Sequence, residues 1–182
     1  MNFFPTVIPE VILVEPRVFD DAREFFMETF RSDQAVSAGI SGNFIQDNHS
    51  GSLKNILRGL HYQVRQPQGK LVRAVSGEIF DVAVDLRRSS PTYGRWTGEI
   101  LSADNKRILW IPPGFAHGFY VLSDWTDVLY KTTEYYSPEW ERTLLWNDPK
   151  VGIRWPIPPG SEPVLSAKDA SGARLADAEV YE

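Results

Sequence analysis

Cysteine is absent from the 182 residues of this chain, and its absence removes several classes of function at once. Disulfides, cysteine nucleophiles and thiolate metal sites all require a sulfur that the chain does not have. Positive charge is also scarce, because 19 lysines and arginines stand against 24 acidic residues and the net charge is −5. No cluster of basic residues offsets this balance, so we expect no nucleic-acid partner.

Long hydrophobic runs are missing as well. No apolar stretch approaches the roughly 20 residues that a membrane-spanning helix needs. The N-terminus, MNFFPTVIPEVILVEP, has neither a basic region nor a small-residue cleavage site, so we expect no signal peptide. These features together favour a cytoplasmic location and no membrane partner.

What the chain does contain is a series of short segments rich in β-branched and aromatic residues and bounded by turn residues. These segments are 11–15, 44–46, 70–75, 78–86, 107–111, 117–122 and 127–133. Many short strands without alternating helices predict an all-β fold, an antiparallel sandwich or barrel. The dipeptide Ser76-Gly77 separates two of the segments and predicts a tight hairpin turn.

Helical periodicity is weak, and only short peripheral helices are expected. Residues 32–40 fit one such helix, with Ser32 or Asp33 as its cap, and residues 166–170 fit another. Apolar residues make up 42% of the chain, which is enough for a real core. No internal repeat or domain boundary is visible, so residues 1–182 are expected to form a single domain.

The stretch LRGLHYQ, at 57–63, carries His61, one of only three histidines in the chain. This histidine could be a metal ligand, a catalytic base or a buried core residue. Metal-binding cupins, which have small barrels of this kind, show His-x-His followed by a glutamate and a later histidine. Here the second histidine position holds Gln63 and the glutamate position holds Lys70, whose ammonium would repel a cation. Only His61 and His117 remain of the expected ligands, and two histidines without a third strong ligand make a poor site, so we expect no bound metal.

A metal-free set of His61, Lys70, Tyr130 and an aspartate suits proton abstraction next to a carbonyl. Imidazole titrates near neutral pH and can act as a base. A lysine ammonium can stabilise the enolate that forms, and a tyrosine hydroxyl can return the proton. Asp81 lies on a strand face that mixes acidic and apolar residues, where a structural role is favoured over that of a second acid. Spacing alone leaves open whether these side chains converge.

Several motifs resemble those of the dTDP-4-dehydrorhamnose 3,5-epimerase family. The most specific are QDNHS at 46–50, RGLH at 58–61, PPGFAHGF at 112–119 and LSAKDA at 165–170. With further matching runs, they follow the family's order over most of the chain. The resemblance implies an antiparallel jelly-roll, cupin-like β-barrel that forms a homodimer. It also implies an enzyme that uses no metal or other cofactor.

The same resemblance implies four catalytic roles. His61 resembles the family's general base, and Asp169 resembles the acid that holds the imidazole in the required tautomer. Tyr130 resembles the acid on the other face of the sugar. Lys70 resembles the group that stabilises the enolate oxygen.

Substrate binding is implied for a further set of residues. Arg23 and Arg58 would hold a diphosphate, because a guanidinium forks onto phosphate oxygens, and Tyr136 would stack on thymine. The other matches to positions that contact the nucleotide or the sugar are Glu28, Gln46, Asn48, His117, Glu141 and Lys168. Two matches meet departures from the family pattern. Glu24 follows Arg23 where the family usually has glycine, and Glu141 lies in the divergent segment PEWERTL.

Two positions keep alternatives open. Arg58 and His61 have opposite strand parity, so both can serve one pocket only if Gly59 marks a bulge or bend. His117 follows PPGFA and could simply close a turn.

The implied reaction is the 3,5-epimerisation of dTDP-4-dehydro-6-deoxy-D-glucose, a dTDP-4-keto-6-deoxyhexose, to dTDP-4-dehydro-L-rhamnose. A proton next to the 4-keto group would leave one face of the sugar and return to the other, at C3 and at C5. A mono-epimerase or a ketoisomerase of a related dTDP-sugar is the nearest alternative. A non-enzymatic cupin sugar-binding module is a third possibility, but it would need neither a base nor an opposed acid. A metal-dependent cupin oxygenase is the fourth.

Overall fold

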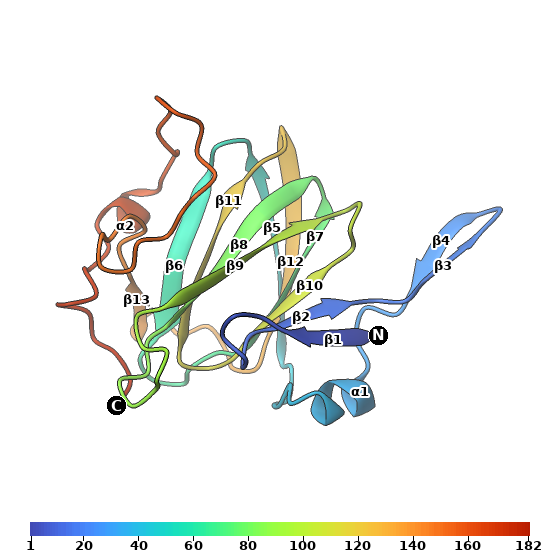
Figure 1. Ribbon diagram of the computed structural model, residues 1–182, viewed down its shortest axis with the longest axis horizontal. Helices are drawn as coiled ribbons and strands as arrows, with labels where there is room; N and C mark the ends of the chain where they lie inside the picture. Colours follow the sequence, from blue (N-terminus) through green and yellow to red (C-terminus); the bar gives the residue numbers. More distant parts are fainter.

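Two antiparallel sheets packed face to face make up most of the computed structural model, which describes residues 1–182 (Figure 1). The six-stranded sheet has the order β1 (Asn2–Pro5), β2 (Ile12–Glu15), β10 (Ile108–Ile111), β7 (Lys70–Ser76), β12 (Trp125–Thr132) and β5 (Gln46–Leu53). The five-stranded sheet has the order β13 (Glu141–Thr143), β6 (Leu57–Gln63), β11 (Phe115–Val121), β8 (Glu78–Asp85) and β9 (Trp96–Ser102). This arrangement confirms the predicted all-β, antiparallel jelly-roll barrel.

Strand β8 explains how the sequence pattern forms this core. Ile79 and Ala83 point between the two sheets, where they join a buried apolar cluster with residues of the facing sheet such as Val128. Val82 and Val84 point to the other side of β8 and pack against the C-terminal segment. Both faces of the strand are therefore buried, which is why it reads as almost continuously apolar.

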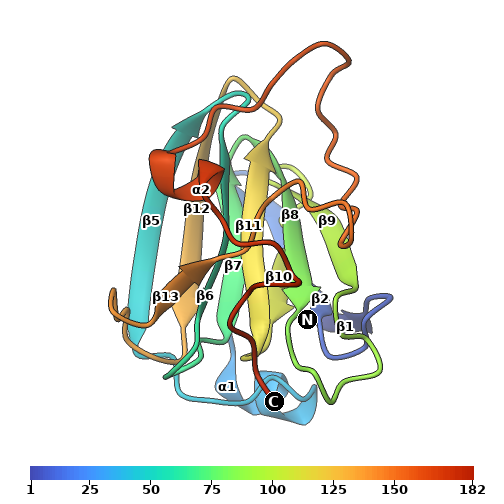
Figure 2. The same cartoon turned by 90° about the vertical axis from the view of Figure 1, so that its left-hand side faces the viewer.

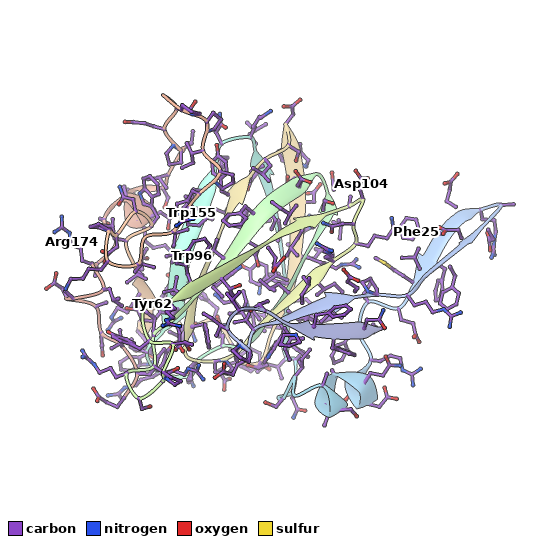
Figure 3. The ribbon with its side chains drawn as sticks, viewed as in Figure 1. Phe25, Tyr62, Trp96, Asp104, Trp155 and Arg174 are labelled. Carbon is purple, nitrogen blue, oxygen red and sulfur yellow. The ribbon has the colours of Figure 1, made fainter.

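The C-terminal segment covers the outer face of the five-stranded sheet (Figure 2). Trp96 and Trp155, labelled in Figure 3, lie on that side of the molecule. Their rings meet Phe80 edge-on, with ring centroids 6.3 and 6.0 Å away. Such aromatic pairs contribute about 0.5–1.5 kcal/mol beyond the area they bury, so this segment is held as part of the fold.

The two helices are α1 (Ser32–Ser37) and α2 (Ala167–Ala170). Both were predicted, although α1 is shorter than the expected 32–40. The predicted cap of α1, Ser32 or Asp33, is wrong, because Arg31 occupies the N-cap position and no side chain accepts a hydrogen bond there. Ser166 does cap α2, since its side chain accepts a backbone N–H of the helix at 3.1 Å. No helix of the structure is long and apolar enough to cross a membrane.

The predicted hairpin at Ser76-Gly77 is wrong, because β7 and β8 belong to different sheets. The turn carries the chain from one sheet to the other instead. Gly77 has a φ of +70°, and a Cβ there would lie 2.1 Å from the carbonyl oxygen of Trp125, so only glycine fits. The strand expected at 44–46 is also displaced, because β5 starts at Gln46 and continues to Leu53.

A small hairpin of β3 (Val18–Asp21) and β4 (Glu24–Met27), which the sequence did not predict, projects away from the barrel (Figure 1). The turn of this hairpin is tight, because Asp21 pairs with Glu24 across it. The Asp21 carboxylate accepts the backbone N–H of Arg23 at 2.8 Å. Glu24 has a φ of +88°, a conformation that favours glycine. The family's usual glycine at this position therefore matches what the turn requires.

Candidate active site

A cavity of about 680 Å³ opens between the two sheets on the side of the barrel where α2 lies. Strands of both sheets contribute to its lining, together with Ser166, Lys168 and Asp169 around α2. All of the predicted site residues except Arg23 and Glu28 line this cavity: Gln46, Asn48, Arg58, His61, Lys70, His117, Tyr130, Tyr136, Glu141, Lys168 and Asp169. Residues far apart in the sequence thus converge in one place.

His61 and Asp169 form a close pair, with 2.5 Å between His61 Nε2 and Asp169 Oδ1. His61 comes from β6, and Asp169 comes from α2, where it is buried. Burial raises the pKa of the Asp169 carboxyl, but the hydrogen bond and charge of His61, the hydrogen bond of Ser166 and the charge of Lys168 together hold the pKa below its usual value. The charged carboxylate accepts the Nε2–H, which leaves Nδ1 as the nitrogen that can take up a proton.

Lys70 and Tyr130 belong to the opposite sheet, on β7 and β12. Lys70 is buried, and its Nζ donates to the backbone oxygen of His61 at 3.3 Å, so it reaches across the gap between the sheets. Burial lowers the pKa of Lys70 to about 8, although the charge of Asp81 acts in the other direction. Burial raises the pKa of Tyr130, which keeps its hydroxyl protonated and able to donate.

His117 lies directly opposite His61 in the pairing of β11 with β6. Its Nε2 is 2.7 Å from Asp81 Oδ1, and both side chains are buried. Burial lowers the pKa of His117, while the neighbouring Asp81 opposes the shift. His117 therefore does more than close a turn, because it forms part of the cavity wall. Asp81 supports it from behind, which agrees with the structural role favoured for this acid.

The predicted irregularity at Gly59 is confirmed. The register between β6 and β11 shifts so that His61 faces His117 while Arg58 faces Phe119, which leaves one extra residue on β6. Gly59 has a φ of +117°, and a Cβ there would lie 2.5 Å from the backbone of β11. This bulge lets Arg58 and His61, despite their opposite parity, line the same cavity. The Arg58 Nε donates to Ser52 at 2.9 Å.

A chain of polar contacts runs along the rim of the cavity. The Tyr136 hydroxyl donates to Glu141 Oε2 at 2.9 Å, and Lys168 Nζ donates to Glu141 Oε1 at 2.9 Å. Burial raises the pKa of Glu141, but these two hydrogen bonds and the charges of His61 and Lys168 together bring it below its usual value. Glu141 thus lies in the cavity wall, although its segment diverges from the family pattern. This series of contacts ends at Lys168, which precedes Asp169, the partner of His61, in the sequence.

Arg23 and Glu28 do not reach the cavity of their own chain. Arg23 lies at the tip of the projecting hairpin, where its side chain is 87% exposed and pairs with Asp21 at 2.5 Å. Glu28 follows the hairpin and lies 3.7 Å from Arg31. The structure therefore separates both residues from the other predicted substrate contacts.

Several lining residues were not predicted. They are Ser50, Ile56, Leu57, Tyr62, Gln63, Gln68, Gly118, Phe119, Val164, Leu165 and Ser166. Strand alternation could have indicated three of them, because Ser50, Gln63 and Phe119 each lie two residues from a predicted site residue on the same strand. No group of three or more histidine, aspartate or glutamate side chains in the structure could hold a metal ion.

Comparison with known proteins gives this site a context. The family model described as dTDP-4-dehydrorhamnose 3,5-epimerase matches residues 5–177. The chain belongs to this epimerase family. The dTDP-4-dehydrorhamnose 3,5-epimerase of Pseudomonas aeruginosa is 58% identical over 175 residues, which are 96% of either chain. The resemblance stated from the sequence motifs is thereby confirmed.

Solved structures of epimerases agree with this membership. The dTDP-6-deoxy-D-glucose-3,5-epimerase of Legionella pneumophila, solved in complex with dTDP-4-keto-L-rhamnose, superposes with a TM-score of 0.94 at 50% identity. The match covers 98% of this chain and 94% of that one. A 3′-monoepimerase from Streptomyces bikiniensis, in complex with dTDP-quinovose, gives 0.87 at 32% identity and covers 94% and 87%. The epimerase fold thus extends over nearly the whole chain.

Proposed function

We propose that this chain is a dTDP-4-dehydrorhamnose 3,5-epimerase, which converts dTDP-4-dehydro-6-deoxy-D-glucose to dTDP-4-dehydro-L-rhamnose. The observation that carries the proposal is the position of its acid and base groups on opposite walls of one cavity. His61, which Asp169 of α2 binds, is on the five-stranded sheet, while Tyr130 is on the six-stranded sheet. A sugar ring between the two sheets would present one face to each group.

The mechanism follows from the chemistry of a 4-keto sugar. The ketone acidifies the hydrogens on C3 and C5, because the carbanion delocalises into an enolate. His61 Nδ1 removes one proton, and the Asp169 carboxylate stabilises the imidazolium that forms. The ammonium of Lys70 stabilises the enolate oxygen. The Tyr130 hydroxyl then protonates the same carbon from the opposite face and inverts it.

Each epimerisation balances in protons. His61 gains the proton that the sugar loses, and Tyr130 gives up the proton that the sugar gains. Exchange with solvent returns both side chains to their starting states before the second centre reacts. No electron leaves the sugar, so neither the C3 step nor the C5 step calls for a redox cofactor.

Arg58 supplies a charge for the diphosphate, since its guanidinium lies in the cavity wall and can fork onto phosphate oxygens. Tyr136, half exposed at the rim, offers a ring on which thymine can stack. The remaining polar groups of the wall would contact the sugar or the nucleotide: Gln46, Asn48, His117, Glu141 and Lys168.

Arg23 and Glu28 fit the same function if the working unit is a homodimer. Phe19, Phe25 and Phe26 of the projecting hairpin are 45%, 54% and 65% exposed, which leaves much of their apolar surface open to solvent in one chain. Phe25 is labelled in Figure 3, and Lys106 Nζ of the barrel lies 4.6 Å from the centre of its ring. We propose that each single-domain chain places its hairpin against the partner's cavity and lends it these two charged residues.

A mixing experiment tests this dimer. Chains with Arg23→Ala and chains with His61→Asn are each expected to be inactive. A mixed dimer regains one complete site, because the first chain contributes an intact base and the second an intact hairpin. Activity that returns on mixing and refolding supports the exchange of hairpins. If no activity returns although light scattering shows dimers, Arg23 does not act in the partner's cavity.

The reaction itself is tested in deuterium oxide with dTDP-4-keto-6-deoxyglucose as substrate. Deuterium is expected at both C3 and C5, and His61→Asn should abolish the exchange at both. Exchange at one carbon only would favour the mono-epimerase alternative, which the related 3′-monoepimerase keeps open. Binding of the nucleotide sugar without any exchange would favour a sugar-binding module.

A further inference from the structure

The segment that carries Tyr136 has an unusual set of hydrogen bonds. Residues 133–137 follow β12 and have no regular secondary structure. No backbone N–H or C=O of Glu134, Tyr135 or Tyr136 is bonded to another backbone group. Buried and half-buried backbone groups need partners, and here side chains provide them.

Gln63 provides two of these partners from one buried side chain, which is only 3% exposed. Its Oε1 accepts the Ser137 N–H at 2.8 Å, and its Nε2 donates to the Tyr135 oxygen at 3.3 Å. The same Nε2 donates to the Gln66 oxygen at 2.9 Å, which fixes the orientation of the amide. One amide thus binds the backbone on both sides of Tyr136, much as a neighbouring strand would.

Two more glutamines hold the same segment. Gln46 Oε1 accepts the Tyr136 N–H at 3.0 Å, and Gln68 Nε2 donates to the Glu134 oxygen at 2.8 Å. We call Gln46, Gln63 and Gln68 the glutamine clamp. In an extended segment the N–H of Tyr136 points away from the groups that Gln63 binds, so the clamp holds Tyr136 from two sides.

The direction of the Tyr136 side chain follows from this grip. Its ring lies at the cavity rim, half exposed, and only its hydroxyl is bonded, to Glu141. A ring without extensive packing keeps its place only if its backbone is fixed. The backbone hydrogen bonds of the glutamine clamp supply that restraint.

We propose that Gln63 is a positioning residue for nucleotide binding, because its buried amide holds the backbone of Tyr135 and Ser137 so that the Tyr136 ring is ready to stack on the base. The proposal rests on the nucleotide-stacking role given to Tyr136 under the proposed function. It assigns to Gln63 no contact with the reacting sugar carbons. Loss of the amide should therefore weaken binding and leave the chemical step intact.

The test measures binding of dTDP by calorimetry, together with kcat and KM, for the full-length protein and its variants. Gln63→Met keeps the length of the side chain but removes its hydrogen bonds. It should weaken dTDP binding about tenfold and raise KM by a similar factor, while kcat changes less than about twofold. Gln34→Met is the matched control, because Gln34 lies on α1 outside the cavity. The control should bind dTDP like the wild type.

A double-mutant cycle shows whether Gln63 acts through the ring. If it does, Gln63→Met has no further effect on dTDP binding once Tyr136→Ala has removed the ring. Additive losses, or wild-type binding by Gln63→Met, would overturn the inference and leave the epimerase proposal standing. Unchanged binding by Tyr136→Ala alone would instead overturn the stacking role itself, and the inference with it.

Gln68→Met tests the same inference if the Gln63 variant does not fold. Gln68 is less buried than Gln63 and binds the same segment through one hydrogen bond. It should weaken dTDP binding about threefold, again only while the Tyr136 ring is present. A loss of equal size in the Tyr136→Ala background would contradict the inference.

Discussion

Replacing Asp169 by asparagine should lower kcat by about a thousandfold while the protein stays folded. The change keeps the shape of the side chain and leaves the backbone N–H bonded to Ser166. It removes the negative charge that lies 2.5 Å from His61 Nε2. Because Asp169 is buried, solvent screens that charge only weakly.

The magnitude follows from the electrostatics of the pair. In the proposed mechanism His61 becomes an imidazolium, and its charge is centred about 4 Å from the centre of the carboxylate. At an effective dielectric constant of about 20, a pair of unit charges at that distance attracts by about 4 kcal/mol. Losing this stabilisation in the transition state corresponds to a rate about 10³-fold lower.

The assay is the rate of deuterium incorporation at C3 and C5, measured by NMR, alongside kcat and KM. The matched control is Asp177→Asn, which changes the same residue type at an exposed position near the C-terminus and should keep the wild-type rate. An Asp169→Asn enzyme that retains a rate within about tenfold of wild type would refute the reasoning. In that case the carboxylate would not stabilise a charged His61.

Three further predictions concern the site and its supports. Lys70→Met should lower kcat with little effect on dTDP binding. Because the pKa of Lys70 is lowered to about 8, wild-type activity should fall as pH rises through about 8, when the ammonium becomes neutral. A pH–rate profile in which Lys70→Arg kept that limb unchanged would argue against this origin. Gly59→Ala should lower the free energy of unfolding, measured in urea, by at least about 2 kcal/mol, because both the φ of +117° at Gly59 and the close approach of β11 exclude a Cβ. An unchanged free energy of unfolding would mean that the bulge can relax. Glu24→Gly should raise the stability of the hairpin by about 1 kcal/mol, because it relieves a φ of +88°, and slower hydrogen exchange at Asp21 and Glu24 would reveal it.

The core of the fold was predictable because strand alternation is a local property. Successive side chains of the strand predicted at 78–86 must point to opposite faces, so Ile79 and Ala83 lie on one face, and Val82 and Val84 on the other. The choice of strand partners is not local, so Ser76-Gly77 looked like a hairpin turn. Its turn chemistry is the same whether the next strand pairs with the previous one or enters the other sheet.

The candidate site also combines features that local sequence could predict with features that it could not. The bulge at Gly59 could be inferred from the parity of Arg58 and His61, which is again local. The pairing of His61 with Asp169 joins residues 108 positions apart, and only the family motifs indicated it. Arg23 was assigned to substrate binding by its motif alone. Nothing in its own segment of the sequence indicates that the hairpin projects from the barrel.

The two-sheet origin of the cavity has a consequence for stereochemistry. The base and the acid of the proposed mechanism are each fixed to a wall, and the walls are held apart by the packing of the core rather than by loops. A change of handedness at a carbon then requires no rotation of the sugar and no movement of the protein. Which carbon reacts depends on how the ring is seated between the walls, so selectivity between C3 and C5 can change without altering a catalytic residue. In such a barrel, the two opposed walls lead to inversion of the reacting carbon, and the residues that line the cavity determine whether that carbon is C3 or C5.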